Sequence, residues 1–291
     1  MKNTVFLFSL LFSSVLFSQI KKETIHSEKL NADREITVKL PRSFNTDLEK
    51  KYPLILVLDS EFLFAPFEGN IAYGNYWDDI PEVILVGIHQ NKKDERFEDS
   101  EFDPNTGLPA NKGGAFFEFI GAELIPFLEK NYKLSPFRVI AGLDATAGLL
   151  NAFLYKEIPQ FSGYISLSPE LAKGMIERIP QSLAATKSTL FYYQATADGD
   201  LKRFQNDIKA LDKNMAGVKN DFLHYKFDDF KDATHYSLAL NAIPSALYQI
   251  FSIYSPISSS EYQNKIAVLA DSHAKYLIDK YEAIEKVIGV K

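Results

Sequence analysis

Hydrophobic residues along this chain fall into short runs separated by longer amphipathic segments. Residues 34–40 (REITVKL) alternate apolar and polar side chains, which predicts a half-buried strand. Residues 54–58 (LILVL) and 83–88 (VILVGI) are continuously apolar, a pattern typical of central parallel strands that are covered on both faces. Further strands are predicted at 138–141, 163–167, 189–195 and 222–227.

The segments between these strands have helical spacing. Residues 116–132 repeat apolar positions at helical intervals with charge on one face, and further helices are predicted from Gly142 to about 156, near 170–185 and at 201–216. Strand and helix therefore take turns along the chain. This order predicts an α/β fold with a mostly parallel central sheet, helices on both faces, and ligands at the carboxyl ends of the strands.

The two ends of the chain differ from this pattern. Residues 1–18 combine Lys2, an apolar run and the small residue Ser18, which predicts a signal peptide and therefore export to the periplasm or the cell exterior. Residues 19–256 are expected to form one α/β domain. Residues 257–291 are polar and amphipathic, and we expect them to form a C-terminal helical extension.

Composition narrows the possible partners. The chain has 291 residues and a formal charge of −6, so an acidic surface makes nucleic acid an unexpected partner. It contains no cysteine, which excludes disulfides, thiolate metal sites and a thiol nucleophile. The histidine spacing matches no zinc motif, and we expect no metal, no cofactor and no stable membrane span. The sequence does not indicate the oligomeric state.

The most informative segment is residues 139–148 (VIAGLDATAG), which predicts a strand, a tight turn and a helix. In a nucleophile elbow of the form G-x-S-x-G, such a turn presents the central side chain at the top of the sheet. Gly142 and Ala145 supply the small residues that this turn requires. Asp144 stands in the position of the serine, and Thr146 in that of the second glycine. The match to an elbow is therefore partial.

The flanking segments carry a broader resemblance. They are residues 52–62 (YPLILVLDSEF), 81–88 (PEVILVGI), 96–99 (RFED), 119–132 (FIGAELIPFLEKNY), 138–142 (RVIAG) and 159–169 (PQFSGYISLSP). In their order and spacing they resemble the esterase family of α/β-hydrolases that includes enterochelin-type siderophore esterases, S-formylglutathione hydrolase and feruloyl esterases. The resemblance spans roughly residues 30–252. It implies an α/β-hydrolase fold and hydrolysis of a small-molecule ester.

The resemblance also implies site residues. The nucleophile position falls on Asp144 and the general base on His235. The acid that orients the histidine falls on Asp198 or Asp200, with Asp200 slightly favoured. One oxyanion donor is expected to be the backbone N–H of Ala145, and the second that of Ser60 or Glu61.

Aspartate at this position excludes the acyl-serine reaction, because a carboxylate has no hydroxyl to deprotonate. Three roles remain open for Asp144: a nucleophile that attacks a saturated carbon, a base that acts on water with His235, or a non-catalytic residue. The nucleophilic role resembles the chemistry of haloalkane dehalogenases and epoxide hydrolases. Those families, however, place an aromatic residue directly after the aspartate, where this chain has Ala145. We therefore expect a hydrolase with a non-standard site; the alternative is an inactive esterase-like binding protein.

Other residues have weaker indications. His26, His224 and His273 are expected to be structural or solvated, and His89 to lie at the carboxyl edge of the sheet near the pocket. Residues 94–107 concentrate acids but lack the glycine and glutamate positions of a calcium loop, so we expect a solvated loop that borders the pocket. Aromatic residues cluster directly after the first central strand, and we expect most of them to belong to the core. They are Phe62, Phe64, Phe67, Tyr73, Tyr76 and Trp77. An aromatic wall there would suit an apolar, phenolic or glycan-type ligand.

Overall fold

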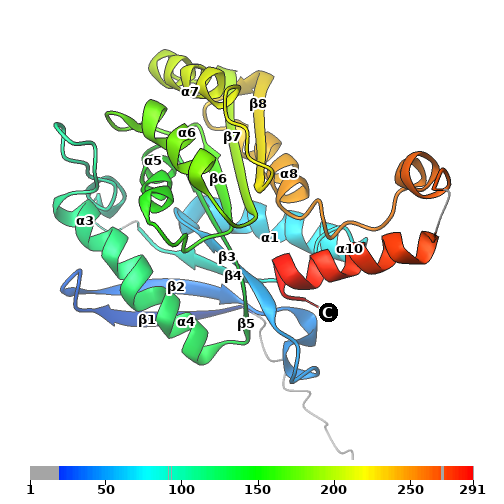
Figure 1. Ribbon diagram of the computed structural model, residues 1–291. Coiled ribbons are helices and arrows are strands. Elements are labelled where there is room, and N and C mark those ends of the chain that lie inside the picture. Colours follow the sequence, from blue (N-terminus) through cyan, green and yellow to red (C-terminus); the bar gives the residue numbers. More distant parts are fainter. Residues whose placement is uncertain (1–19, 91, 93, 270–271, 291) are drawn as a thin grey trace, which may run out of the picture.

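The computed structural model describes residues 20–90, 92, 94–269 and 272–290, and their eight strands form one sheet (Figure 1). The strand order is β1-β2-β4-β3-β5-β6-β7-β8. The strands are β1 (Ile20–Ser27), β2 (Ala32–Lys39), β3 (Tyr52–Val57), β4 (Ile84–Ile88), β5 (Leu134–Leu143), β6 (Gly163–Leu167), β7 (Leu190–Gly199) and β8 (Leu223–Thr234). All pairs from β4 to β8 are parallel, whereas β1 pairs with β2, and β2 with β4, in antiparallel fashion. The prediction of a mostly parallel α/β fold is confirmed.

Helices cover both faces of this sheet (Figure 1). One face carries α1 (Ser60–Tyr76), α8 (Leu238–Ile250) and the end of α10 (His273–Ile288). The other carries α3 (Asn111–Glu118), α4 (Ile125–Asn131), α5 (Ala145–Leu150), α6 (Met175–Ala185) and α7 (Lys202–Met215). Shorter turns are η1 (Arg42–Asn45), α2 (Glu95–Glu98), η2 (Phe119–Leu124), η3 (Asn151–Tyr155), α9 (Ser259–Glu261) and η4 (Tyr262–Ile266).

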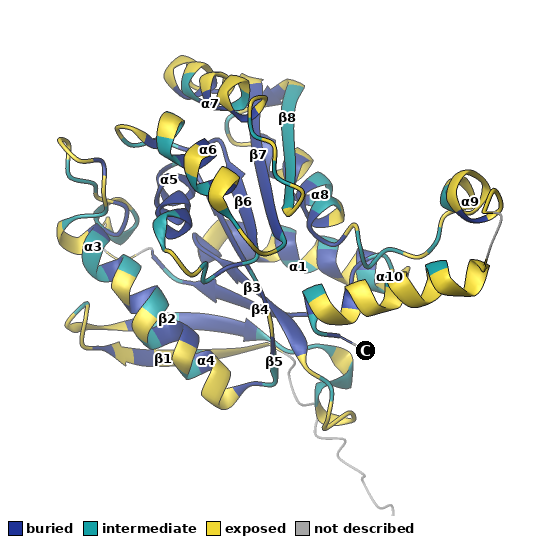
Figure 2. Cartoon of the chain, in the orientation of Figure 1, coloured by how far each residue is buried: buried dark blue, intermediate teal, exposed yellow. Residues whose placement is uncertain are grey.

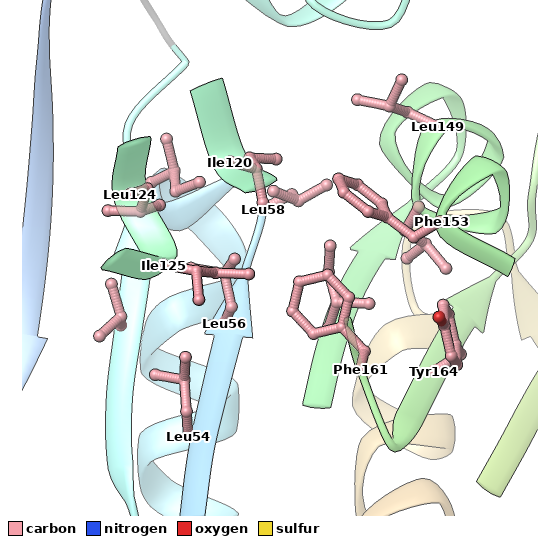
Figure 3. Packing of buried hydrophobic residues seen from close by; sticks show 14 of the residues in the cluster. Leu54, Leu56, Leu58, Ile120, Leu124, Ile125, Leu149, Phe153, Phe161 and Tyr164 are labelled. Atoms are coloured by element: carbon pink, nitrogen blue, oxygen red, sulfur yellow. The ribbon is translucent and has the colours of Figure 1, made fainter. Parts of the chain in front are cut away.

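Two hydrophobic clusters, one on each face, hold the layers together. Along β3 successive side chains point to opposite faces, so Leu54 and Leu56 enter one cluster and Ile55 and Val57 the other. In the first cluster Leu56 lies near Ile125 of α4, Leu58 lies near Ile120 of η2, and Phe161 lies beside Tyr164 (Figure 3). Colouring by burial shows strands β3 to β7 almost entirely buried between exposed outer helix faces (Figure 2). Burial on both faces explains why these strands are continuously apolar in the sequence.

Four elements differ from the sequence prediction. Strand β1 was not predicted, because most of its side chains are exposed and only Ile25 and Ser27 are buried. Strands β7 and β8 extend beyond their predicted ends to Gly199 and Thr234, where polar residues replace the apolar pattern. The predicted helix over residues 116–132 exists, but it begins earlier, at Asn111, and contains the π-helical turn η2.

The C-terminal segment is joined to the domain core. Ile284, Ile288 and Val290 are buried in the same cluster as Phe137 of β5, and the hydroxyl of Ser135 donates a hydrogen bond to the carbonyl of Ile288 over 2.8 Å. A helical C-terminal segment is thus observed, and its final turn is part of the core. The predicted signal peptide, residues 1–18, lies outside the described residues. Within the described part of the chain no helix is long and apolar enough to cross a membrane.

Candidate active site

Asp144 occupies a sharp turn between β5 and α5. Its backbone angles are φ 62° and ψ −118°, a strained conformation for a residue with a Cβ atom. Gly142 is required by the close packing of this turn, because a Cβ atom there would lie 2.7 Å from Oγ1 of Thr146. The Asp144 side chain is 20% exposed, so it can be reached from solvent. Its burial nevertheless raises the pKa of the carboxyl above the ordinary aspartate value, against the opposing effects of Arg96 and His235.

Arg96, which the sequence analysis assigned no role, lies beside Asp144. Its Nη1 donates to Oδ2 of Asp144 over 3.4 Å, and its Nη2 donates to the carbonyl of Leu143 over 2.7 Å. Its Nε donates to Oδ1 of Asp59 over 2.6 Å. The Asp59 side chain is completely buried, so this ion pair provides the charge compensation that a buried carboxylate requires. The guanidinium therefore links the end of β3 to the turn after β5.

Thr146 contacts Asp59 and Leu143, the two residues that Arg96 also contacts. Its Oγ1 lies 2.5 Å from Oδ2 of Asp59 and 2.9 Å from the carbonyl oxygen of Leu143, and it accepts a hydrogen bond from the N–H of Leu143 over 3.1 Å. Thr146 is completely buried. The residue that stands where an ordinary elbow has glycine thus makes side-chain contacts that glycine cannot make.

His235 and Asp200 form a second pair at the carboxyl ends of β8 and β7. Nδ1 of His235 lies 2.7 Å from Oδ1 of Asp200. The Asp200 carboxylate also accepts hydrogen bonds from Ser168 Oγ at 2.7 Å, Thr196 Oγ1 at 2.9 Å and the N–H of Leu201 at 2.8 Å. Asp198, the other predicted candidate, is more exposed and pairs with Lys231 instead.

The electrostatics of this pair follow from its contacts. The hydrogen bond to Asp200 raises the pKa of His235 above its ordinary value, and the Asp144 charge adds to this effect. Burial would raise the pKa of Asp200, but hydrogen bonds from His235, Ser168 and Thr196 lower it below the usual range. Because Nδ1 faces Asp200, Nε2 is the ring nitrogen left for proton transfer.

Asp144 and His235 lie in the same site without touching. Among the described residues no ion pair within 4.0 Å joins them, and each favours the charged form of the other through space. The structure thus brings Asp144, His235 and Asp200 to one edge of the sheet, with Asp144 contacted directly by Arg96. A water or a substrate atom is needed to connect the carboxylate with the imidazole.

The predicted oxyanion donors lie at the starts of two helices. Ala145 is the first residue of α5, and Ser60 and Glu61 are the first two of α1. Backbone N–H groups in a first helical turn have no partner within the helix. The two turns are adjacent, because the N–H of Leu58 donates to the carbonyl of Ala141 over 2.9 Å. A pocket of about 170 Å³ adjoins the start of α1. It is lined by Asp59, Glu61, Phe62, Gln90, Asp94, Arg96 and Phe97.

The aromatic cluster after β3 is divided between core and surface. Phe64 and Phe67 are buried, whereas Phe62, Tyr73, Tyr76 and Trp77 are exposed, so the prediction that most of these residues belong to the core is wrong. Helix α1 has one face toward the sheet and one toward solvent, and its aromatic residues occur on both. Phe62 and Phe97 both line the pocket, and the centre of each ring lies near the Arg96 guanidinium, at 5.7 and 5.6 Å.

The remaining histidines and acids form no metal site within the described residues. His89 lies near the pocket, as the sequence predicted, with Nε2 2.8 Å from Thr37 Oγ1 and Nδ1 3.2 Å from a Glu61 carboxylate oxygen. These contacts fix its ring against the sheet edge. In the predicted acidic loop, Asp103 accepts hydrogen bonds from the N–H groups of Asn105 and Thr106, and an isolated bridge joins Phe102 to Pro109.

Comparison with known proteins defines the class. The family model described as "Putative esterase" matches residues 27–220, and the chain belongs to this esterase family. An uncharacterised protein from Capnocytophaga ochracea is 30% identical, with a TM-score of 0.86; the match covers 94% of this chain and 75% of that one.

More distant structures share the fold. An IroE-like serine hydrolase from Shewanella oneidensis is 19% identical with a TM-score of 0.76, over 94% of this chain and 89% of that one. The enterobactin esterase of Shigella flexneri is 18% identical with a TM-score of 0.61, over 80% of this chain and 58% of that one. No curated protein matches.

Proposed function

We propose that this protein is an exported hydrolase of small ester-type molecules in which Asp144 is the nucleophile, His235 the base and Asp200 the residue that orients it. The observation that carries the proposal is the His235–Asp200 pair. Its 2.7 Å contact is supported by three further donors to Asp200, which is the arrangement that holds an imidazole ready to accept a proton.

The two oxygens of Asp144 have different surroundings, as a nucleophilic carboxylate needs. Arg96 holds Oδ2, while Oδ1 has no hydrogen-bond partner among the described residues. In the first step Oδ1 attacks a saturated carbon of the substrate. A new C–O bond forms, the bond from that carbon to the leaving group breaks, and the leaving group departs with the electron pair. For an ester the leaving group is its carboxylate.

In the second step His235 Nε2 takes a proton from water, and the resulting hydroxide attacks Cγ of the alkylated Asp144. The bond between Cγ and the alkyl-bearing oxygen breaks, and the product alcohol leaves with that oxygen and a proton from the imidazolium. Asp144 is left as a carboxylic acid with one oxygen from water, and it recovers its carboxylate when that proton passes to solvent. The N–H groups of Ala145 and of Ser60 or Glu61 are the proposed donors to the oxyanion formed at Cγ.

A second candidate function is that of an inactive, esterase-like protein that binds a small ester or glycan-type ligand. The observation that favours it is the Arg96–Asp144 pair, because a carboxylate held by a guanidinium is a weaker nucleophile than a free one. Export to the periplasm or cell exterior is part of both proposals and rests on the leader-like composition of residues 1–18. The named substrate of the enterobactin esterase is one ester to include in tests of either function.

The test is a covalent trap. In His235→Ala the second step loses its base, so an alkylated Asp144 accumulates. We expect intact-protein mass spectrometry, after exposure to panels of small esters, epoxides and haloalkanes, to show an added alkyl mass, and peptide mapping to place it on Asp144.

The matched control is His235→Ala combined with Asp144→Asn, which should acquire no adduct. An adduct on another residue, or equal labelling in the control, would remove Asp144 from the nucleophile role. A binding protein would give no adduct on any panel while still showing saturable ligand binding by calorimetry.

A further inference from the structure

Thr146 and Asp144 are the two positions at which the turn departs from G-x-S-x-G, and the structure connects them through two other side chains. Thr146 Oγ1 lies 2.5 Å from Oδ2 of Asp59, and Asp59 Oδ1 accepts from Arg96 Nε over 2.6 Å. Arg96 Nη1 reaches Oδ2 of Asp144 at 3.4 Å. The two departures thus lie at the ends of one chain of hydrogen bonds.

The Thr146 hydroxyl has one proton and two nearby acceptors. Burial raises the pKa of Asp59, but the Arg96 charge and the hydrogen bonds to Asp59 favour its carboxylate form. Its Oδ2 lies 2.5 Å from the Thr146 hydroxyl, closer than the Leu143 carbonyl at 2.9 Å, so the proton goes to Asp59. This assignment agrees with Leu143 N–H donating to the same hydroxyl oxygen. Thr146 therefore satisfies Oδ2 of Asp59.

This bond determines where the guanidinium points. Oδ2 of Asp59 has a second donor, Arg96 Nη2, at a long 3.5 Å, while the same Nη2 bonds the Leu143 carbonyl at 2.7 Å. Because Thr146 supplies the short hydrogen bond to Oδ2 of Asp59, the Arg96 guanidinium does not rotate to bond both oxygens of Asp59 closely. Its Nη1 remains directed at Asp144.

We propose that Thr146 is a positioning residue for Asp144: it fixes Asp59, Asp59 fixes Arg96, and Arg96 holds one carboxylate oxygen of Asp144 while the other faces substrate. This role affects the reaction only if Asp144 is the nucleophile proposed above. It also gives a physical reason why threonine stands where the turn ordinarily has glycine, since glycine would leave a buried carboxylate oxygen short of a donor.

The test follows the titration of Asp144 by ¹³C NMR of its carboxyl carbon, with the signal assigned by its loss in Asp144→Asn. In Thr146→Val and in Thr146→Gly, Asp59 loses the hydroxyl and draws the guanidinium toward itself. Asp144 then loses part of its cationic partner, and its pKa should rise by about one unit. Thr146→Ser keeps the hydroxyl and should titrate as the wild type does.

Ser135→Ala is the matched control, because Ser135 is also buried and its hydroxyl donates a hydrogen bond outside the site, to the carbonyl of Ile288 over 2.8 Å. It should leave the Asp144 titration unchanged. The proposal is overturned if Thr146→Gly, shown by a thermal melt to be folded, has the same Asp144 titration as the wild type. It is also overturned if the Asp144 titration shifts as far in Thr146→Ser as in Thr146→Gly. Glycine is the residue that such turns accommodate, so this variant keeps the test available should valine prevent folding.

The titration is independent of turnover. If no adduct forms on Asp144 while the titration shifts as expected, the nucleophile proposal fails and the positioning role of Thr146 stands. If the adduct forms and the titration does not shift, only the proposed positioning role of Thr146 fails.

Discussion

Nδ1 of His235 lies 2.7 Å from Oδ1 of Asp200, and the Asp200 side chain has no exposed surface. A buried carboxylate in contact with an imidazole favours the imidazolium, which is why the pKa of His235 is raised while that of Asp200 is lowered. Ser168 completes this pair, and its φ of 43° indicates backbone strain that the surrounding structure maintains. The pair therefore orients the histidine and makes its imidazole a stronger base.

Asp200→Asn should lower the pKa of His235, because the carboxylate that stabilises the imidazolium is lost. We expect an NMR titration of the histidine ring to move to lower pH and turnover to fall by a factor on the order of 10³. Asp198→Asn is the control, since Asp198 pairs only with exposed Lys231 among the described residues. An unchanged His235 titration in Asp200→Asn would contradict this account of the pair.

The His235–Asp200 pair also predicts how stability depends on pH. His235 has a folded-state pKa raised above 6.5, so its contribution to the free energy of unfolding is fully present below pH 6.5. That contribution is lost as the pH rises through the folded-state pKa. Urea unfolding of wild type and His235→Gln from pH 5 to 9 measures it; the gap between them should shrink toward alkaline pH, and a gap that widened would contradict the assignment.

Arg96→Met should destabilise the fold by about 3–5 kcal/mol, because the buried Asp59 carboxylate loses its cation. Replacing Asp59 with Asn in the same chain removes the unpaired charge and should recover part of this loss. Arg203 pairs with Glu170 at the surface, and Arg203→Met should change stability by no more than about 1 kcal/mol. Chemical denaturation of the variants provides the comparison, and equal losses in the two arginine variants would argue against Arg96 as a structural link.

The C-terminal helix α10 should contribute to stability through its last turns only. Ile288 is completely buried, so Ile288→Ala should cost about 2–5 kcal/mol. Ile278 lies on the same helix and is 55% exposed, and Ile278→Ala should cost well under 1 kcal/mol. Thermal melts of both variants test whether residues 257–290 belong energetically to the domain.

Sequence patterns predicted the parts of the structure that depend on local periodicity. The central strands are apolar throughout because both faces are covered, and the turn at Asp144 is visible from its small neighbours Gly142 and Ala145. Strand β1 lies at the sheet edge with most side chains in solvent, so its sequence lacks that signal. The exposed part of the aromatic cluster, four of its six residues, was likewise missed, because composition does not indicate which face of α1 each ring occupies.

The connections within the site could not be predicted in the same way. Arg96 is 48 positions from Asp144 in the chain and reaches it from the short helix α2, in a segment with no periodic pattern. Its only sequence signal is an arginine that follows a predicted central strand, where ligand sites of parallel sheets occur. Thr146 was noticed as a departure from glycine, but its partner Asp59 lies in the turn between β3 and α1. Contacts of this kind depend on the pairing of β3 with β5, which only the folded chain establishes.

The proposed reaction is tested most directly by wild-type turnover in water enriched in ¹⁸O, followed by mass spectrometry of the peptide that contains Asp144. If Asp144 is the nucleophile, water attacks its Cγ, and ¹⁸O accumulates in the Asp144 carboxylate over repeated turnovers while the first product alcohol carries the original oxygen. If His235 instead activates water against the substrate, the label appears in the product from the first turnover and never in Asp144. That second result would contradict the account.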